Sequence, residues 1–240
     1  MPFINDSLCA FNFMTKKHLR TIHSFVKRQG RLTSGQEIAL ETQWAIYGID
    51  YSEDVLDFEK LFDRKAETVL EIGFGNGDSL WKMAQASPRL NFIGIEVHRP
   101  GVGHILRLIK ESDCENLRVS NQDAIDVLQH QIPDHSLDRV QLFFPDPWHK
   151  KKHNKRRIVQ EQFIQQLAKK LKPGGVFHLA TDWKDYAQHM LTTLNDSDLF
   201  CNLSDDNTFV PKPETRPTTK FEKRGHRLGH DVWDLLFKSK

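Results

Sequence analysis

The stretch that decides the fold is Glu71-Ile-Gly-Phe-Gly-Asn-Gly-Asp78, which begins inside a short apolar run at residues 68–72. Further apolar runs follow at 91–97, 117–119, 137–144 and 175–180, and patterns typical of helices separate them at 78–86, 101–112, 123–130 and 157–171. Short apolar runs that alternate with helices predict stacked βαβ units, in which helices cover both faces of a parallel sheet. The sequence therefore predicts an α/β fold, with the glycine-rich stretch at a turn from strand to helix.

The 240-residue chain divides into two parts that differ in composition and in hydrophobic pattern. Residues 1–60 are polar and basic and contain one predicted helix from Ser34 to about Ala45, with Ser34 as N-cap and Glu37 at N3 of a capping box. We expect this part to be an N-terminal extension that packs on an α/β domain of residues 61–240. In that domain, Lys172-Pro-Gly-Gly175 predicts the end of a helix and the start of a strand, residues 183–194 predict one more helix, and an apolar stretch closes the chain at 232–237.

Charge is nearly balanced over the whole chain but strongly separated along it. The formal net charge is +2, whereas residues 7–36, 147–160 and 212–227 carry +6, +6 and +4, which leaves −14 for the rest. A fold that brings the three segments together has one strongly basic face. Such runs are also common on solvated loops and helix faces, so charge alone leaves a nucleic-acid partner undecided.

The cysteines, the N-terminus and the length of the apolar runs limit the cellular compartment and the kind of site that we expect. The three cysteines form no C-x-x-C pair, which argues against a disulfide framework or a zinc site, and we expect no metal. The N-terminus does not resemble a signal peptide, and no apolar run reaches the roughly 18 residues that span a bilayer. The sequence therefore predicts a cytoplasmic protein without a membrane partner or an evident obligate protein partner, either a monomer or a homodimer.

The glycine-rich stretch predicts a cofactor site. Dinucleotide folds place G-x-G-x-x-G at this turn, so that backbone amides hold a pyrophosphate. Here the pattern is G-x-G-x-G over Gly73, Gly75 and Gly77, and Asp78 stands where that fingerprint has its third glycine. A carboxylate at a helix N-terminus suits capping but repels a phosphate. The pattern favours a cationic nucleoside cofactor without phosphate, such as S-adenosylmethionine, and a structural tight turn is the alternative.

Acidic residues near the ends of three successive strands strengthen this interpretation. Glu71 lies in the first run, Glu96 ends the second, and Asp123 follows the third. Open α/β sheets bind ligands at the carboxyl ends of their strands, where Glu96 can accept hydrogen bonds from a ribose diol and Asp123 can contact an adenine edge. Each of these two acids alone is better explained as a helix N-cap. All three together with the glycine loop point to a cofactor.

The segment after the fourth strand combines a carboxylate, an aromatic ring and a cationic run. In Pro145-Asp-Pro-Trp-His149 two prolines bracket Asp146 and stiffen the loop, and Trp148 offers a flat surface on which a base can stack. A rigid turn whose Trp148 fills the core is the alternative. The basic run from Lys150 to Arg157 follows directly and suits phosphates. Beside a methyl donor, this combination suggests a nucleic-acid base as the methyl acceptor.

These motifs resemble those of the bacterial tRNA (guanine-N7-)-methyltransferase family, over nearly the whole chain from about Arg20. The glycine loop marks only the broad class of S-adenosylmethionine enzymes, whereas the stretches from Gln141 to His149 and from Thr219 to His230 are far more specific. The other matching stretches are Arg20–Leu32, Gly94–Val97, His153–Arg157 and Arg216–Thr218.

The resemblance implies a class I methyltransferase fold, a Rossmann-like, mostly parallel seven-stranded sheet whose last strand is antiparallel. It implies transfer of a methyl group from S-adenosylmethionine to N7 of a guanosine in the tRNA variable loop, at position 46. The residues that it assigns to the cofactor are Glu71, Gly73, Gly75, Gly77, Glu96, Asp123 and Asp146, with Asp146 also the active-site residue. Those assigned to the substrate are Lys150, Asp182, Thr219, Lys220, Phe221 and Glu222. Those assigned to the RNA are Lys152, His153, Asn154, Lys155, Arg156 and Arg157.

Three other functions compete with this interpretation. A methyltransferase for exocyclic amino groups often has Asp or Asn, two prolines and an aromatic residue in this loop, but only one proline follows Asp146 here. A non-catalytic RNA-binding module does not need the intact glycine loop and the strand-end acids. A dehydrogenase is the weakest candidate, because the chain lacks G-x-G-x-x-G at this turn.

Overall fold

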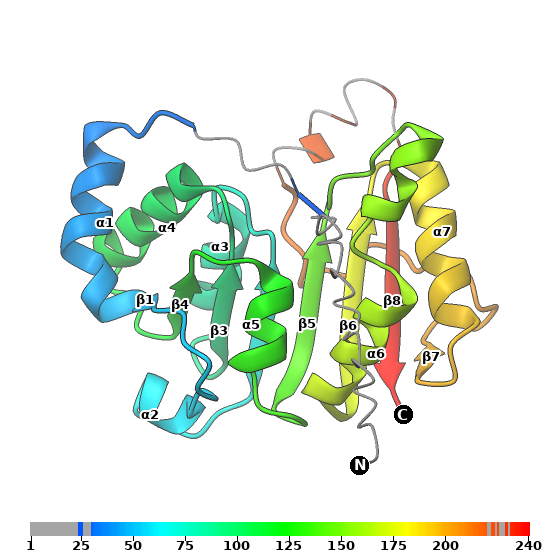
Figure 1. Ribbon diagram of the computed structural model, residues 1–240, viewed down its shortest axis with the longest axis horizontal. Coiled ribbons are helices and arrows are strands. Elements are labelled where there is room, and N and C mark those ends of the chain that lie inside the picture. The colour runs from blue at the N-terminus through cyan, green and yellow to red at the C-terminus, as the bar shows by residue number, and fades with distance from the viewer. Residues whose placement is uncertain (1–23, 26–29, 220–221, 224, 226–228, 230) are drawn as a thin grey trace, which may run out of the picture.

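The computed structural model describes residues 24–25, 30–219, 222–223, 225, 229 and 231–240. In this part of the chain eight strands form one sheet in the order β1-β4-β3-β2-β5-β6-β8-β7 (Figure 1). The strands are β1 (Gly48–Ile49), β2 (Thr68–Ile72), β3 (Asn91–Ile95), β4 (Leu117–Ser120), β5 (Leu137–Phe143), β6 (Leu171–Thr181), β7 (Phe200–Asn202) and β8 (Trp233–Ser239). Neighbours from β1 across to β6 pair in parallel, whereas β8 is antiparallel to both β6 and β7.

Helices cover both faces of the sheet. They are α1 (Ser34–Tyr47), α2 (Phe58–Phe62), α3 (Asp78–Ala86), α4 (Arg99–Glu111), α5 (Ala124–His130), the 3-10 helix η1 (Lys151–Arg156), α6 (Glu161–Lys170) and α7 (Lys184–Asn195). Side chains alternate across a strand, so Leu70 and Ile72 of β2 share a core with α5, α6 and α7, while Val69 shares the other core with α1, α3 and α4.

The predicted fold class is confirmed: the sheet is mostly parallel, helices lie on both faces, and the last strand is antiparallel. The sheet has eight strands rather than seven, because the two-residue β1 adds to its edge beside β4. Such a short pairing leaves no hydrophobic pattern in the sequence from which it could be predicted.

The predicted N-terminal helix exists, but it begins differently. Its N-cap is Thr33 and not Ser34, and the capping box pairs Thr33 with Gln36 and not Ser34 with Glu37. The helix packs along α4, where a Cβ on Gly103 would lie 2.8 Å from the carbonyl oxygen of Gln36. Residues 1–23, including most of the first basic segment, lie outside the described residues.

Two further boundaries differ from prediction. The strand expected to begin at Gly175 begins at Leu171, which pairs with Leu137, and a register shift between Leu137 and Arg139 accommodates the added residues. The helix expected from residue 157 begins at Glu161, because residues 157–160 are not helical and include the buried Arg157 and Val159. No helix in the described ranges is long and apolar enough to cross a membrane.

Parallel pairing brings the carboxyl ends of β2 to β6 to one edge of the sheet, the upper edge in Figure 1. The glycine loop follows β2, Glu96 follows β3, and Asp123 follows β4 after a short turn. The segment with Asp146 leaves β5, and Asp182 comes directly after β6. Residues distant in sequence are thus gathered at one edge by the topology alone.

We predict that Gly101→Ala destabilises the protein by about 1–3 kcal/mol, because overpacking forces the backbone to move. A Cβ on this residue of α4 would lie 1.9 Å from the carbonyl oxygen of Gly75. The control is Gly35→Ala in α1, where no atom lies within 4 Å of the added Cβ and a gain of about 0.4–1 kcal/mol is expected. Urea unfolding measures both variants, and wild-type stability of Gly101→Ala would contradict the prediction.

Candidate active site

A cavity of about 460 Å³ opens at the carboxyl edge of the sheet, and we call it the edge cavity. The predicted site residues that line it are Gly73, Gly75, Glu96, Asp123 and Asp146. A larger hollow of about 1040 Å³ lies between α6, the end of α7 and the C-terminal residues, towards the opposite edge, and none of the predicted site residues lines it. The edge cavity is therefore the candidate site.

The glycine loop is a tight turn that leads into α3. Gly73, Gly75 and Gly77 have φ angles of 75°, 61° and 80°, in the left-handed region that glycine adopts without steric cost. Gly77 is the N-cap of α3, and a Cβ there would lie 2.5 Å from the Cδ1 atom of Ile105. Gly77 is not among the lining residues of the cavity, and its contribution is to let α3 and α4 meet closely.

Glu96 ties the glycine loop to the start of α4. Its Oε2 accepts a hydrogen bond from the amide of Gly75 and its Oε1 accepts one from the amide of His98, both at 2.8 Å. Burial raises the pKa of Glu96, while these backbone hydrogen bonds oppose the shift. Each carboxylate oxygen can accept a second hydrogen bond, so a ligand hydroxyl can bind here while the loop stays fixed.

Glu71 is a buried acid with unused hydrogen-bonding capacity. It is only 3% exposed, and among the described residues its Oε2 has no hydrogen-bond partner. Burial raises the pKa of Glu71 to about 8, with a further contribution from the charge of Glu96. The neighbouring strand places Gln141 directly opposite, and its Oε1 likewise has no partner in the described chain. An unsatisfied buried acid of this kind is typical of functional sites.

Asp123 combines the two roles that the sequence left open. Its Oδ1 accepts a hydrogen bond from the amide of Ile125 at 3.0 Å and thereby caps α5. The same residue lines the edge cavity. The cap fixes the carboxylate at the cavity wall, so capping and ligand binding are compatible here.

The loop after β5 presents Asp146 to the edge cavity as an exposed side chain. Phe144 and Trp148 have φ angles of 51° and 48°, a left-handed conformation that costs a non-glycine residue about 1–3 kcal/mol. Two contacts hold this strained loop: the amide of Phe144 donates to the carbonyl of Ala180 at 2.7 Å, and Nε of Arg157 donates to the carbonyl of Pro147 at 2.9 Å.

Trp148 neither fills the core nor presents both faces for stacking. The guanidinium carbon of Arg156 lies 3.7 Å from the centroid of its ring, a cation–π contact. Its Nε1 donates to the backbone carbonyl of Ser24 at 3.0 Å. One face of the ring is therefore covered by a residue of the basic run itself.

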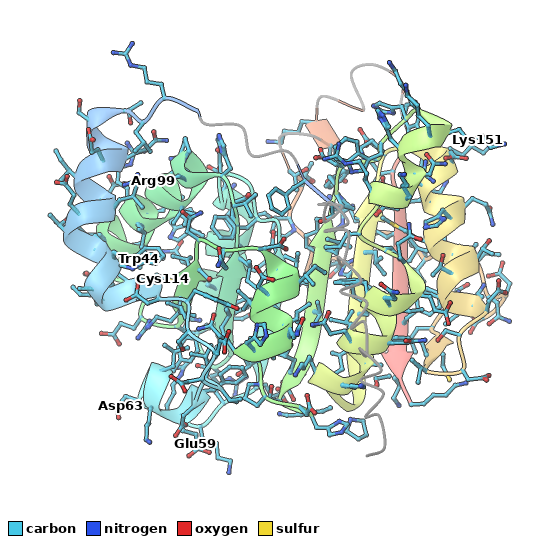
Figure 2. All side chains as sticks on the ribbon, in the orientation of Figure 1. Trp44, Glu59, Asp63, Arg99, Cys114 and Lys151 are labelled. Atoms are coloured by element: carbon cyan, nitrogen blue, oxygen red, sulfur yellow. The ribbon has the colours of Figure 1, made fainter. Side chains whose placement is uncertain are left out.

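The basic run forms η1, and its residues differ in exposure. Lys150, Lys151, Lys152 and Lys155 are exposed, and Figure 2 shows Lys151 at the end of the molecule where the parallel strands end. His153 and Asn154 are half-buried, and the Asn154 backbone carbonyl accepts a hydrogen bond from Gln160 at 3.2 Å.

Arg157 is different, being 3% exposed. Its guanidinium forms an ion pair with Asp185 and lies 4.9 Å from the ring centroid of Tyr186. The predicted RNA contact of this residue stays a prediction, and the described geometry gives Arg157 an internal bracing role.

Apart from Lys150 at the start of η1, the predicted substrate residues belong to two places. Asp182 lines a separate hollow of about 640 Å³ together with Trp183 and Trp233. Thr219 and Glu222 bond to each other: the amide of Glu222 donates to Oγ1 of Thr219 at 3.1 Å, and the amide of Thr219 donates to Oε2 of Glu222 at 3.3 Å. Lys220 and Phe221, between them, lie outside the described residues.

Arg216 received no role of its own in the sequence analysis, where it stands in a basic segment and in a stretch that matches the family. The side chain of Arg216 is fully buried and forms ion pairs with Glu222 and Asp234. A signal was present in the sequence, because Asp234 interrupts the apolar stretch at 232–237 and a buried acid requires a buried partner. Within the described ranges, no three His, Cys, Asp or Glu side chains form a group that could hold a metal ion.

Solved methyltransferase structures share this fold. The 16S rRNA methyltransferase KamB matches with a TM-score of 0.56 at 15% identity, over 78% of this chain and 95% of its own. A variant of a 16S rRNA (adenine(1408)-N(1))-methyltransferase from Catenulisporales acidiphilia matches with a TM-score of 0.51 at 12% identity, over 80% and 92%. At such identities the likeness concerns the fold alone.

Sequence comparison is more specific. A family described as putative methyltransferase matches residues 65–235. A tRNA (guanine-N(7)-)-methyltransferase of Shewanella oneidensis is 60% identical over 222 residues, which cover 92% of this chain and 93% of the relative. The protein of that name from Yersinia enterocolitica is 54% identical over 237 residues, 99% of both chains. The chain therefore belongs to the tRNA (guanine-N(7)-)-methyltransferase family.

Proposed function

We propose that this protein transfers a methyl group from S-adenosylmethionine to N7 of a guanosine in the variable loop of tRNA, at position 46. The observation that carries the proposal is the edge cavity itself. Three acids line it, whereas its described lining contains no lysine or arginine, and an exposed basic helix follows the same loop. The names of the relatives support guanine N7 of tRNA as the acceptor.

The edge cavity fits a cationic cofactor without phosphate. The fit rests on the acids of its wall and on Glu71, whose unpartnered oxygen lies within the described core beside the glycine loop. Glu96 suits the ribose hydroxyls and Asp123 the adenine edge, while Gly73, Gly75 and Gly77 shape the loop around the ligand. When bound, S-adenosylmethionine supplies an electrophilic methyl group on a sulfonium centre.

The acceptor chemistry requires few groups from the protein. Guanine N7 carries a lone pair, so no base has to remove a proton before the methyl group is transferred. The residues of the site then act by alignment, which lowers a barrier by up to about 7–11 kcal/mol in well-oriented cases. Because methylation makes the base cationic, a carboxylate beside it stabilises the developing charge, and Asp146, Asp182 and Glu222 are the candidates.

We assign the binding of tRNA to residues around the cavity. Lys150, Asp182 and the Thr219–Glu222 stretch contact the acceptor nucleotide, and residues 152–156 contact the RNA backbone, while the buried Arg157 holds the loop that precedes them. Incubation of the protein with unmodified tRNA and S-adenosylmethionine, followed by mapping of the methylated nucleotides, tests the whole assignment. The proposal requires 7-methylguanosine at position 46, and a methylated exocyclic amino group would contradict it.

Asp146→Ala is expected to lower kcat at least about 100-fold, the scale seen when one stabilising group of a reacting centre is removed. Binding of tRNA changes little, because the basic helix remains. The measurements are methyl transfer under saturating substrates and tRNA affinity by filter binding. Asp205→Ala, which removes an exposed acid outside the edge cavity, serves as the control and keeps wild-type turnover. Near-normal kcat of Asp146→Ala would refute its role.

Neutralising Lys151, Lys152 and Lys155 together with glutamine is expected to weaken tRNA binding and to flatten its salt dependence. For every phosphate that the variant no longer binds, the slope of log K against log salt becomes shallower by about 0.7. The control is Lys60→Gln with Lys65→Gln, two exposed lysines in and just after α2, and Figure 2 shows the neighbouring Glu59 and Asp63 at the end of the molecule far from Lys151. An unchanged slope in the triple variant would exclude η1 as the phosphate site.

The proton on Glu71 makes both folding and cofactor binding depend on pH. With a pKa of about 8 in the folded protein and 4.5 as the reference value, Glu71 is neutral at pH 7 when folded and ionised when unfolded. The folded state holds more protons between these two values, so the free energy of unfolding falls as the pH rises through this window. A cationic cofactor favours the ionised carboxylate, so its binding releases a proton.

Glu71→Gln is neutral at every pH and is expected to remove both effects. Its advantage over the wild type in unfolding free energy is small at pH 5 and grows towards pH 8, by up to about 1.4 kcal/mol per pH unit. Its affinity for S-adenosylmethionine no longer rises between pH 6 and 7.5, as that of the wild type does. Urea unfolding and calorimetric titration at several pH values measure the two effects, and parallel pH profiles for both proteins would disprove this assignment.

A further inference from the structure

Beside the edge cavity lies a cluster of buried charged side chains, of which the proposed reaction uses only Glu222. It consists of His178 on β6, Asp234 on β8, and Arg216 and Glu222 from the segment between β7 and β8. We call it the Arg216 cluster. All four residues are at most 2% exposed, and Lys212 joins from the surface with a 2.9 Å contact to Glu222.

Arg216 holds both acids through paired hydrogen bonds. Its Nε and Nη2 donate to the two carboxylate oxygens of Asp234, each at 2.7 Å. Its Nη1 and Nη2 donate to the two oxygens of Glu222 at 2.8 and 3.2 Å. A guanidinium matches two carboxylates in this way because its donors are planar and fixed, and the single ammonium of a lysine cannot.

The cluster is electrostatically balanced. Burial alone would raise the pKa values of Asp234 and Glu222, but their hydrogen bonds and ion pairs outweigh it, so both pKa values are lowered and both acids are ionised. Burial lowers the pKa of His178, whose Nε2 donates one hydrogen bond to the ionised Asp234 at 2.8 Å. Two acids therefore face Arg216 and Lys212, and removal of one member leaves a buried charge without its partner.

The Arg216 cluster lies between the cavity wall and the segment assigned to the acceptor. The guanidinium carbon of Arg216 lies 5.8 and 5.7 Å from the ring centroids of Phe143 and Phe144, which line the edge cavity three and two residues before Asp146. On its other side, Glu222 closes the reciprocal hydrogen bonds with Thr219. The same guanidinium thus contacts the wall of the donor site and anchors the Thr219–Glu222 turn.

We propose that Arg216 is a positioning residue for methyl transfer. By clamping Glu222 to Asp234 next to Phe143 and Phe144, it fixes the position of Thr219 and Glu222 relative to the edge cavity, where the acceptor base receives the methyl group. This inference rests on the proposed function and deepens it. It makes Arg216 and Glu222 one unit, because the paired hydrogen bonds of Arg216 are what join Glu222 to Asp234 on β8.

The central experiment is a double-mutant cycle on the full chain with Arg216→Lys and Glu222→Gln, assayed at a temperature where unfolding curves show each variant to be folded. Arg216→Lys keeps the charge and loses the paired geometry. Each single variant is expected to lower kcat/KM for tRNA at least about tenfold, with the dissociation constant of S-adenosylmethionine changed less than about threefold. The double variant is expected to be no worse than the poorer single variant, because groups that act as a unit are not additive.

Three results would overturn the proposal. One is wild-type kcat and KM in both single variants, which would leave the cluster a purely stabilising role. Another is a double variant whose loss equals the product of the single losses. A third is an equal loss of kcat/KM in the control Arg118→Lys, which changes an arginine of β4 that also stacks on aromatic rings but lies outside the edge cavity. If Arg216→Lys does not fold, a second double-mutant cycle combines Glu222→Gln with Lys212→Gln. This cycle tests the ion pair between Lys212 and Glu222 at the outer side of the cluster.

Hydrogen exchange separates this inference from the proposed function. In Arg216→Lys the amides of Thr219 and Lys223, both hydrogen-bonded within the turn, are expected to exchange at least about tenfold faster, while the amides of β2 and β3 keep wild-type rates. Unchanged exchange at the turn would refute the clamp even if tRNA is methylated. Absence of methyl transfer in the wild type, combined with faster exchange at the turn, would refute the proposed function and leave the clamp in place.

Discussion

The hydrogen bonds that Glu96 accepts from Gly75 and His98 tie together the loops on which the edge cavity depends. The backbone carbonyl of Glu96 also accepts a hydrogen bond from Asn121 at 2.7 Å, which brings in the segment after β4. Parallel pairing places these strand ends at one edge of the sheet. The hydrogen bonds of Glu96 then fix the positions of the loops that follow them relative to one another. A carboxylate suited to bind a ligand is therefore also the residue that shapes the ligand's site.

The same edge separates two kinds of charge. Burial raises the pKa values of Glu96 at the cavity wall and of Glu71 in the core beside the glycine loop, and a bound cation favours the ionised form of both acids. The lysines of η1 stay in solvent, where a polyanion can approach them. The near-neutral total of +2 thus conceals sites of opposite character, for which a cationic donor and an anionic acceptor are the complementary partners.

The alternation of apolar runs and helices was enough to predict the fold class, the position of the glycine loop and the edge at which Glu96, Asp123 and Asp146 meet, because these follow from local pattern and parallel topology. Contacts that are distant in sequence were not predictable in this way. Arg157 and Arg216 stand in basic segments like surface residues, and only the folded chain shows that both are buried and form ion pairs with Asp185 and Asp234. The helix cap at Thr33 instead of Ser34 reflects a choice between adjacent residues of equal capping ability.

The two buried arginines explain how the loop with Asp146 keeps its strained conformation. Arg157 holds its far end, from the carbonyl of Pro147 to Asp185 at the start of α7, and Arg216 packs beneath Phe143 and Phe144 and is anchored on β8. Positive φ angles at Phe144 and Trp148 persist only if the surroundings fix them. The described basic segments therefore hold two kinds of residue: lysines that stay exposed at η1, and buried arginines that hold the carboxylate of Asp146 in place against the edge cavity.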